Sequence, residues 1–147
     1  MARARWFSPV ALVLVIVGGA LGVAARAAIV VPLTPALGMH THPLVVPAAT
    51  LGINLLGSLL LGFVVGWLDD RHPLARTFLG TGVIGGFTTY SAFAAQSVTT
   101  ASASPLVGLA LIAVSLLGGV LCAAIGLAVG RRVVDRPGEV ESAGDAE

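Results

Sequence analysis

The sequence predicts an all-α membrane protein with four transmembrane helices, the third of which is broken in the middle of the membrane. Of its 147 residues, 56% are hydrophobic and 10% are charged, with a mean hydropathy of +0.99. A soluble domain carries about 25% charged residues. Four apolar segments reach the roughly 20 residues that a helix needs to cross a bilayer. The sequence GGFTTYSAF (85–93) interrupts the third segment.

The predicted spans are residues 10–31, 44–68, 75–99 and 105–130. The first follows two arginines, as a signal peptide would, but it is longer than such a peptide and three further spans follow it. We expect residues 1–134 to form a single four-helix transmembrane domain. Residues 135–147 are polar and rich in acidic residues, and we expect a disordered tail there.

The arginines are distributed unevenly across the membrane. Seven of the eight lie on one side of a four-span protein: Arg3, Arg5, Arg71, Arg76, Arg131, Arg132 and Arg136. The loops on the other side contain neither Lys nor Arg. The positive-inside rule therefore predicts a multi-pass protein of the inner (plasma) membrane with both termini in the cytoplasm. Because the arginines form no long cluster with interleaved aromatic residues, we expect no nucleic-acid partner.

The interruption at residues 85–93 marks a candidate ion site. Two glycines followed by two threonines weaken a helix where lipid offers the freed backbone groups no partner. Non-helical backbone at membrane depth is tolerated only where protein or a water-filled path surrounds it. Such a break turns backbone dipoles toward a bound or passing ion. Tyr90 and Phe93 follow one helical turn apart, so we expect their rings on nearly the same face.

Further polar residues lie within the spans. Arg26 either extends its side chain to the headgroups or supports an anion path or the end of a helix. Asn54 either bridges two helices or, with Ser58 one turn later, forms part of a polar track. Gln96 and Ser115 add polar positions in the third and fourth spans, and Ser115 alone would hydrogen-bond its own helix.

The spans contain no Asp or Glu. An intramembrane carboxylate is the usual exchange site of a small proton-coupled antiporter, so the sequence favours passive conduction of an ion. No nucleophile and base occur in a catalytic arrangement and no phosphate-binding loop is present. We therefore predict that the chain is not an enzyme.

Three motifs, in order, resemble the small four-helix fluoride channels of the Fluc (CrcB-type) family. They are GGALGVAAR (18–26), TLGINLLGSLLLGF (50–63) and TGVIGGFTTYSAF (81–93). Each motif is rich in glycine and unspecific by itself, whereas the ordered set is specific. The resemblance covers residues 18–130 and implies a passive, fluoride-selective channel that exports fluoride and lowers its toxicity.

The resemblance also implies an antiparallel, dual-topology dimer in the lipid bilayer, with fluoride pathways at the subunit interface. A structural sodium ion, Na⁺, which is not transported, would bind the backbone carbonyls of Gly85 and Thr88. The residues implied for the fluoride pathway are Asn54, Thr89, Tyr90, Ser91, Phe93 and Ser115, and those implied to support it are Arg26, Ser58 and Gln96.

The chain departs from the family pattern at three positions. Tyr90 stands where phenylalanine is usual, Gln96 where glutamate is common, and Leu111 where a tyrosine is common. A chain that inserts in both orientations needs balanced flanking charges, so the arginine bias favours a heterodimer with an oppositely oriented homologue. A homodimer remains open. The alternative functions are a small four-helix drug or cation exporter and a non-conducting partner subunit of a heterodimeric fluoride channel.

Overall fold

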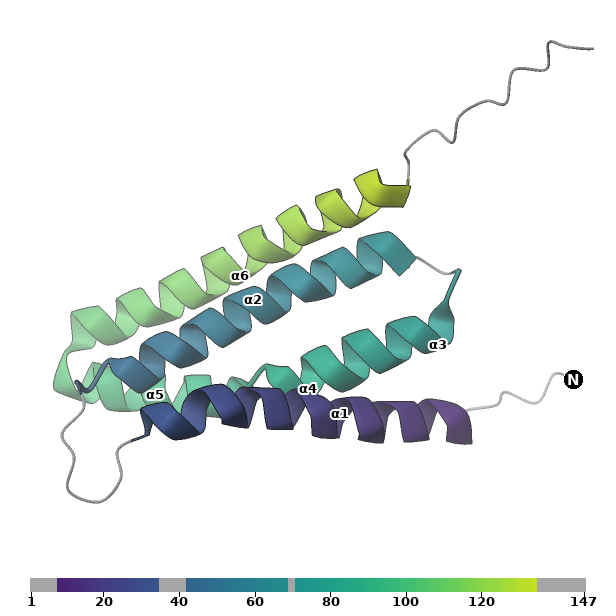
Figure 1. Ribbon diagram of the computed structural model, residues 1–147. Helices are drawn as coiled ribbons and strands as arrows, with labels where there is room; N and C mark the ends of the chain where they lie inside the picture. The colour runs from purple at the N-terminus through teal and green to yellow at the C-terminus, as the bar shows by residue number, and fades with distance from the viewer. Residues whose placement is uncertain (1–7, 35–41, 69–70, 135–147) are drawn as a thin grey trace, which may run out of the picture.

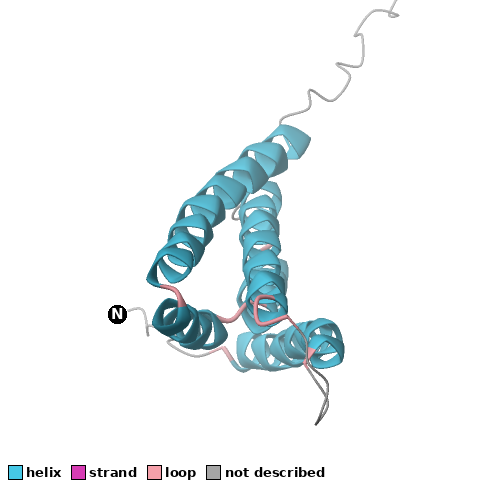
Figure 2. Cartoon of the chain, turned by 90° about the vertical axis from the view of Figure 1, so that its left-hand side faces the viewer, coloured by secondary structure: helices cyan, strands magenta, loops and turns pink. Residues whose placement is uncertain are grey.

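The computed structural model describes residues 8–34, 42–68 and 71–134. These residues are almost entirely helical and contain no strand, which confirms the all-α class. Figure 2 shows that loops occur only as short connections between the helices. The elements are α1 (Pro9–Val30), η1 (Val31–Leu33), α2 (Val45–Leu68), α3 (Pro73–Arg76), η2 (Thr77–Ile84), α4 (Gly85–Phe87), α5 (Tyr90–Ala103) and α6 (Pro105–Val134).

Three continuous helices are long and apolar enough to cross a membrane: Pro9–Leu33, Val45–Leu68 and Pro105–Val134. The shortest has 24 residues. At about 1.5 Å per residue it is about 36 Å long, which exceeds the roughly 30 Å of a bilayer core. The predicted third span, 75–99, is not one continuous helix, because α3, η2 and α4 lead to a break before α5. The predicted tail, 135–147, lies outside the described residues.

The break falls at the threonines and not at the glycine pair. Gly85 has helical backbone angles (φ −62°, ψ −37°) and begins α4. Thr88 (φ −77°, ψ 160°) and Thr89 (φ −147°, ψ 115°) are extended. Thr89 then caps α5, since its side chain accepts a hydrogen bond from the backbone N–H of Ala92. Threonine suits both roles, because β-branched residues favour extended backbone and hydroxyls make good N-caps.

The segment before the break is a wide helix. Within η2 the backbone is a π-helix, and the N–H of Gly85 reaches the carbonyl of Gly80, five residues earlier. Stretches of π-helix are rare and frequently lie at functional sites. The wide turns therefore occur immediately before the interruption that the sequence marks as a candidate ion site.

The helices form two closely packed pairs, as Figure 1 shows. α1 lies along η2 and α4, and α2 lies along α6 in the same direction, while α5 turns back against the first half of α6. Glycines allow these close approaches. A Cβ on Gly62 or Gly66 of α2 would overlap backbone carbonyls of α6, and a Cβ on Gly126 or Gly130 of α6 would overlap those of α2. Such small faces are a main source of helix association in lipid.

The helices bury little apolar surface against one another. Only Ile53, Val64, Leu68 and Ile84 are buried hydrophobic residues among those described. Large apolar side chains on α6 point outward, and Leu106 and Leu117 are 79% and 73% exposed. Exposed apolar helices of this length are typical of a multi-pass membrane protein, where lipid covers the outward faces.

Candidate ion site at the break between α4 and α5

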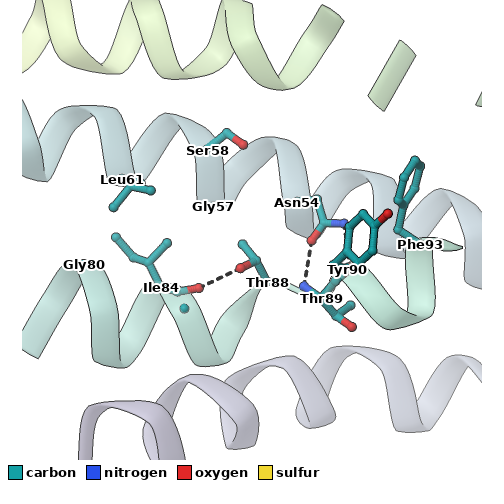
Figure 3. A pocket seen from close by; sticks show the side chains of 11 residues that line it. Asn54, Gly57, Ser58, Leu61, Gly80, Ile84, Thr88, Thr89, Tyr90 and Phe93 are labelled. Atoms are coloured by element: carbon teal, nitrogen blue, oxygen red, sulfur yellow. Dashed lines mark hydrogen bonds between the residues drawn. The ribbon is translucent and has the colours of Figure 1, made fainter. Parts of the chain in front are cut away.

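Asn54 holds the broken backbone from the neighbouring helix. The Nδ2 group of Asn54 on α2 donates to the carbonyl of Thr89 at 3.1 Å, and the N–H of Thr89 donates to Oδ1 of Asn54 at 2.9 Å. Both groups would have bonded within a continuous helix. The amide of Asn54 therefore replaces the lost helical partners of one residue, and Figure 3 shows it directed at the break. This is the helix-bridging role, and it leaves one N–H of the amide for another partner.

The last turn of α4 closes on the carbonyl of Ile84. The N–H of Thr88 and its hydroxyl both donate to this oxygen, at 3.0 and 3.1 Å. The methyl group of Thr88 packs against α2, where a Cβ on Gly57 would overlap it. Gly57 follows Asn54 by about one turn, and this spacing could have identified it from the sequence as part of the site.

A pocket of about 280 Å³ lies at the break, between α2 and the segment from η2 to α5. Its lining brings together seven of the residues that the sequence analysis assigned to the site: Asn54, Ser58, Gly85, Thr88, Thr89, Tyr90 and Phe93. Gly57, Leu61, Gly80 and Ile84 complete the lining and were not predicted. The lining therefore combines amide, hydroxyl and aromatic groups within an otherwise apolar surface.

The aromatic pair stands at one end of this pocket. The ring centroids of Tyr90 and Phe93 lie 6.1 Å apart, and the ring planes are inclined by 53°. Figure 3 shows both side chains extending from the start of α5. Tyr90 is 81% exposed, whereas Phe93 is half-buried. Aromatic ring edges are electropositive, so this pair can present a favourable surface to an anion.

Gly85 and Thr88 line the same pocket, and their backbone carbonyls remain available among the described residues. Hydrogen bonds near the break use the carbonyls of Ile84, Gly86 and Thr89. Within the described part of the chain, none uses the carbonyls of Gly85 or Thr88. Carbonyl oxygens suit a hard cation such as sodium. Two such oxygens are fewer than a cation of this size takes up, so further ligands would have to come from elsewhere.

Arg26 contacts the break from α1. Its Nε group lies 3.4 Å from the carbonyl of Gly86 and donates to it. Arg26 thus provides a donor for one of the carbonyls that have no helical partner at the end of α4. Of the alternatives that the sequence left open for Arg26, this geometry corresponds to supporting the end of a helix.

Three other predicted residues lie outside the pocket lining. The hydroxyl of Ser91 lies 3.3 Å from that of Thr89, but its side chain is exposed. Gln96 is half-buried farther along α5. Ser115 lies on α6, and its buried Oγ makes no hydrogen bond within the described residues. The buried Oγ of Ser97 on α5 also makes no hydrogen bond within the described residues. The sequence analysis did not predict Ser97 as a site residue. Its position directly after Gln96, as a second polar residue in an apolar span, was the signal that could have identified it.

Long apolar helices, with amide, hydroxyl and aromatic groups gathered in a pocket at a helix break, define a class of helical membrane protein. Comparison with known proteins narrows this class. Residues 13–127 match the family described as "CrcB-like protein, Camphor Resistance (CrcB)". The chain belongs to this family, which confirms the resemblance stated from its motifs.

Named relatives cover most of the chain. The "Fluoride-specific ion channel FluC 2" of Bacillus subtilis is 40% identical over 121 residues, which are 81% of this chain and 86% of the relative. The protein of the same name from Corynebacterium jeikeium is 43% identical over 138 residues, 84% of this chain and 79% of the relative. The "Fluoride-specific ion channel FluC" of Hyphomonas neptunium is 38% identical over 125 residues, 82% and 94% of the two chains. These names are those of ion channels and not of enzymes, in agreement with the prediction from the sequence.

Proposed function

We propose that this chain forms a passive, fluoride-selective channel that exports fluoride from the cytoplasm and so lowers its toxicity. The observation that carries the proposal is the pocket at the break, where Asn54, Thr89 and the rings of Tyr90 and Phe93 meet. The names of the relatives support fluoride as the ion.

The driving force is the membrane potential. Fluoride enters a cell as neutral HF, dissociates near neutral pH and cannot recross lipid as an anion. An inside-negative potential favours outward movement of one charge by about 2.3 kcal/mol per 100 mV. A selective pore is therefore sufficient for export, and no coupling to a proton gradient is needed.

Selectivity requires groups that replace the hydration of fluoride without retaining the ion. Asn54 keeps one N–H beyond the two bonds that it makes to Thr89. Hydroxyls of Ser58, Thr89, Ser91 and Ser115 provide further donors, and the ring edges of Tyr90 and Phe93 provide weaker electropositive contacts. Fluoride is the smallest halide and the strongest hydrogen-bond acceptor among them, so closely spaced donors favour it over chloride.

A structural sodium ion, which is not transported, would bind the carbonyls of Gly85 and Thr88. Both residues line the pocket, and neither carbonyl is used by a hydrogen bond in the described part of the chain. A second, oppositely oriented subunit would supply the remaining oxygens, since the break in each chain offers the same two. The ion would then hold two breaks together at the centre of a dimer.

The dimer is proposed to be antiparallel and embedded in the inner membrane, with both termini of this chain in the cytoplasm. The segment from Pro73–Arg76 to Tyr90–Ala103 would serve as a broken third span, giving four spans in all. Tyr90 is 81% exposed beside the polar pocket, where lipid is a poor partner for its hydroxyl. A second subunit over this face would cover Tyr90 and enclose the pathway.

Fluoride efflux from liposomes tests the proposed function. The purified chain is reconstituted alone, or with an oppositely biased homologous chain, into liposomes loaded with potassium fluoride. Valinomycin then allows potassium to leave, and an electrode records external fluoride. We expect rapid efflux that is indifferent to an imposed proton gradient, and no release from liposomes loaded with chloride.

The same assay separates the alternatives. Efflux that requires a proton gradient would indicate an exporter, and this would contradict the proposal. Efflux only in the presence of the homologous chain, and unaffected by substitutions in this chain, would indicate a non-conducting partner subunit. Empty liposomes, and liposomes with an unrelated four-helix membrane protein, are the controls for leakage.

A further inference from the structure

Ser97 on α5 has a buried hydroxyl without a partner in the part of the chain that the structure describes. Its side chain is 5% exposed, and its Oγ makes no hydrogen bond to any described residue. A buried polar group of this kind lowers stability unless something binds it. In a native structure it therefore calls for a specific explanation.

Other hydroxyl groups on these helices donate a hydrogen bond to the backbone carbonyl one turn earlier. Ser102, also on α5, donates to the carbonyl of Val98 at 2.9 Å. Thr77 and Thr88 donate in the same way to Pro73 and Ile84. This bond is the usual solution for serine and threonine in a membrane helix. Ser97 does not make this bond to a described residue, although its side chain is buried.

Ser97 lies on the face of α5 that packs against α6. A Cβ on Gly108 of α6 would overlap Ala101 of α5, so these two residues face each other directly. Ser97 precedes Ala101 by four residues and therefore lies on the same face of α5. Ser115 follows Gly108 by seven residues, or two turns, and lies on the corresponding face of α6.

The two serines thus lie on the facing sides of an antiparallel hairpin. With Gly108 opposite Ala101, Ser115 lies opposite Ala94 and about one turn from the level of Ser97. Phe93 precedes Ser97 by one turn and lines the pocket at the break. Two hydroxyls that have no partner among the described residues therefore lie between the aromatic end of the pocket and the contact of α5 with α6.

We propose that Ser97, together with Ser115, forms a further hydrogen-bonding position for fluoride on the far side of Phe93. Each hydroxyl donates one hydrogen bond to the ion and is left without a partner when the ion moves on. The unsatisfied hydroxyls are then a stability cost retained for conduction. This inference rests on the proposed fluoride channel, and the tests below are chosen so that the two can fail separately.

The first test compares Ser97→Ala with Ser97→Thr and with Ser102→Ala in the liposome assay. A hydrogen bond to a charged group is strong, so Ser97→Ala is expected to slow fluoride efflux by about tenfold or more. Ser97→Thr retains the hydroxyl and is expected to retain most of the rate. Ser102→Ala removes a hydroxyl from the same helix that is bonded to Val98 and exposed, and it should conduct as the unsubstituted chain does.

Thermal unfolding in detergent distinguishes conduction from structure. Removing an unpaired buried hydroxyl relieves its penalty, so Ser97→Ala should unfold at the same or a higher temperature while conducting more slowly. A structural hydroxyl would behave differently, with stability and efflux falling together. That result, or an unchanged rate in Ser97→Ala, would overturn the proposal.

Silver accessibility tests the position without relying on conduction. Ser97→Cys and, as a lipid-facing control, Leu117→Cys are introduced into a chain in which Cys122→Ser removes the native thiol. Ag⁺ is added to the proteoliposomes, and unreacted thiol is then counted with a maleimide after denaturation. We expect rapid protection at position 97 and little at position 117, because thiols react as thiolates and lipid disfavours ionisation.

The channel function and the fluoride position at Ser97 therefore predict different outcomes in these tests. Absence of fluoride efflux from the unsubstituted chain, with and without a partner, would contradict the channel function. Rapid reaction of the thiol at position 97 would, in that case, still support a hydrated position between α5 and α6. Failure of Ag⁺ to reach position 97 would overturn the position even if the unsubstituted chain conducts fluoride.

Discussion

The side chain of Asn54 binds the backbone of Thr89 at the break, while neighbouring carbonyls stay without a hydrogen-bond partner among the described residues. Its amide forms two hydrogen bonds with Thr89, at 2.9 and 3.1 Å, from a helix 35 residues away in the sequence. These bonds make the extended conformation of Thr88 and Thr89 tolerable in a membrane. The carbonyls of Gly85 and Thr88, two residues that line the same pocket, accept no hydrogen bond in the described part of the chain.

The Asn54→Ala substitution should therefore affect both folding and conduction. The N–H and carbonyl of Thr89 would lose their partners, and an unsatisfied buried group costs about 1–3 kcal/mol. We expect fluoride efflux to be lost and the unfolding temperature in detergent to fall. The substitution Leu56→Ala on the outward face of the same helix is the control. Full stability of Asn54→Ala would contradict the bridging role.

Phe93 and Tyr90 should respond differently to substitution. Phe93→Ile replaces an electropositive ring edge with an alkyl group, and aromatic interactions of about 1 kcal/mol predict a loss of efflux of about fivefold or more. Tyr90→Phe removes only a hydroxyl, which makes no hydrogen bond within the described residues. We expect it to conduct at nearly the original rate. Initial rates in the liposome assay measure both, and equal loss in both variants would contradict an ion contact through the ring of Phe93.

At the scale of the helical elements, the close packing of the helices brings two side chains to the break between α4 and α5. α1 packs on η2 and α4 because Gly18 and Gly22 allow its backbone to approach them closely. This approach brings Arg26 to the carbonyl of Gly86 at the end of α4. On the other side, α2 is held against α6 by glycines of both helices, and this orientation directs Asn54 toward Thr89. The break is thus held from two sides.

Two alanine substitutions on α2 test the packing of this helix. A Cβ on Gly62 would overlap the carbonyl oxygen of Ala123, whereas a Cβ on Gly52 would meet no atom within 4 Å. Gly62→Ala is expected to destabilise the protein by about 1–3 kcal/mol, which is typical of overpacking. Gly52→Ala should change stability by less than about 1 kcal/mol, since only helix propensity differs. Unfolding temperatures in one detergent compare the two, and similar values would contradict the proposed importance of the α2–α6 contact.

At the scale of the whole molecule, the exposed surface indicates which faces lipid can cover. Lipid suits the outward apolar faces of α1 and α6, but it does not suit an open pocket that contains Asn54 and Thr89. A second subunit over the pocket would resolve this conflict. The strong arginine bias predicts that this chain inserts in one orientation, so the partner of an antiparallel dimer would be a different chain with the opposite bias.

Growth on fluoride tests the need for a partner. The chain is expressed in a channel-deficient strain, alone or with a homologous chain of opposite arginine bias. We expect fluoride resistance only when both are present, because one orientation alone cannot form an antiparallel dimer. Strong resistance with this chain alone would contradict the heterodimer and would indicate a homodimer inserted both ways. A C-terminal reporter that is active only in the cytoplasm serves as the control for orientation.

The sequence by itself determined the helical membrane class, the family and the nine residues within which the predicted third span is interrupted. Hydropathy and glycine–threonine composition act locally, so they can be interpreted without a fold. The tertiary structure alone decided that the glycine pair stays helical, that the break falls at Thr88 and Thr89, and that Ser97 has no partner among the described residues. At the break, Asn54 and Arg26 bind backbone groups that lie 35 and 60 residues away in the sequence. Such contacts arise only when the packing of α1, α2 and α6 fixes which groups at the break find a hydrogen-bond partner.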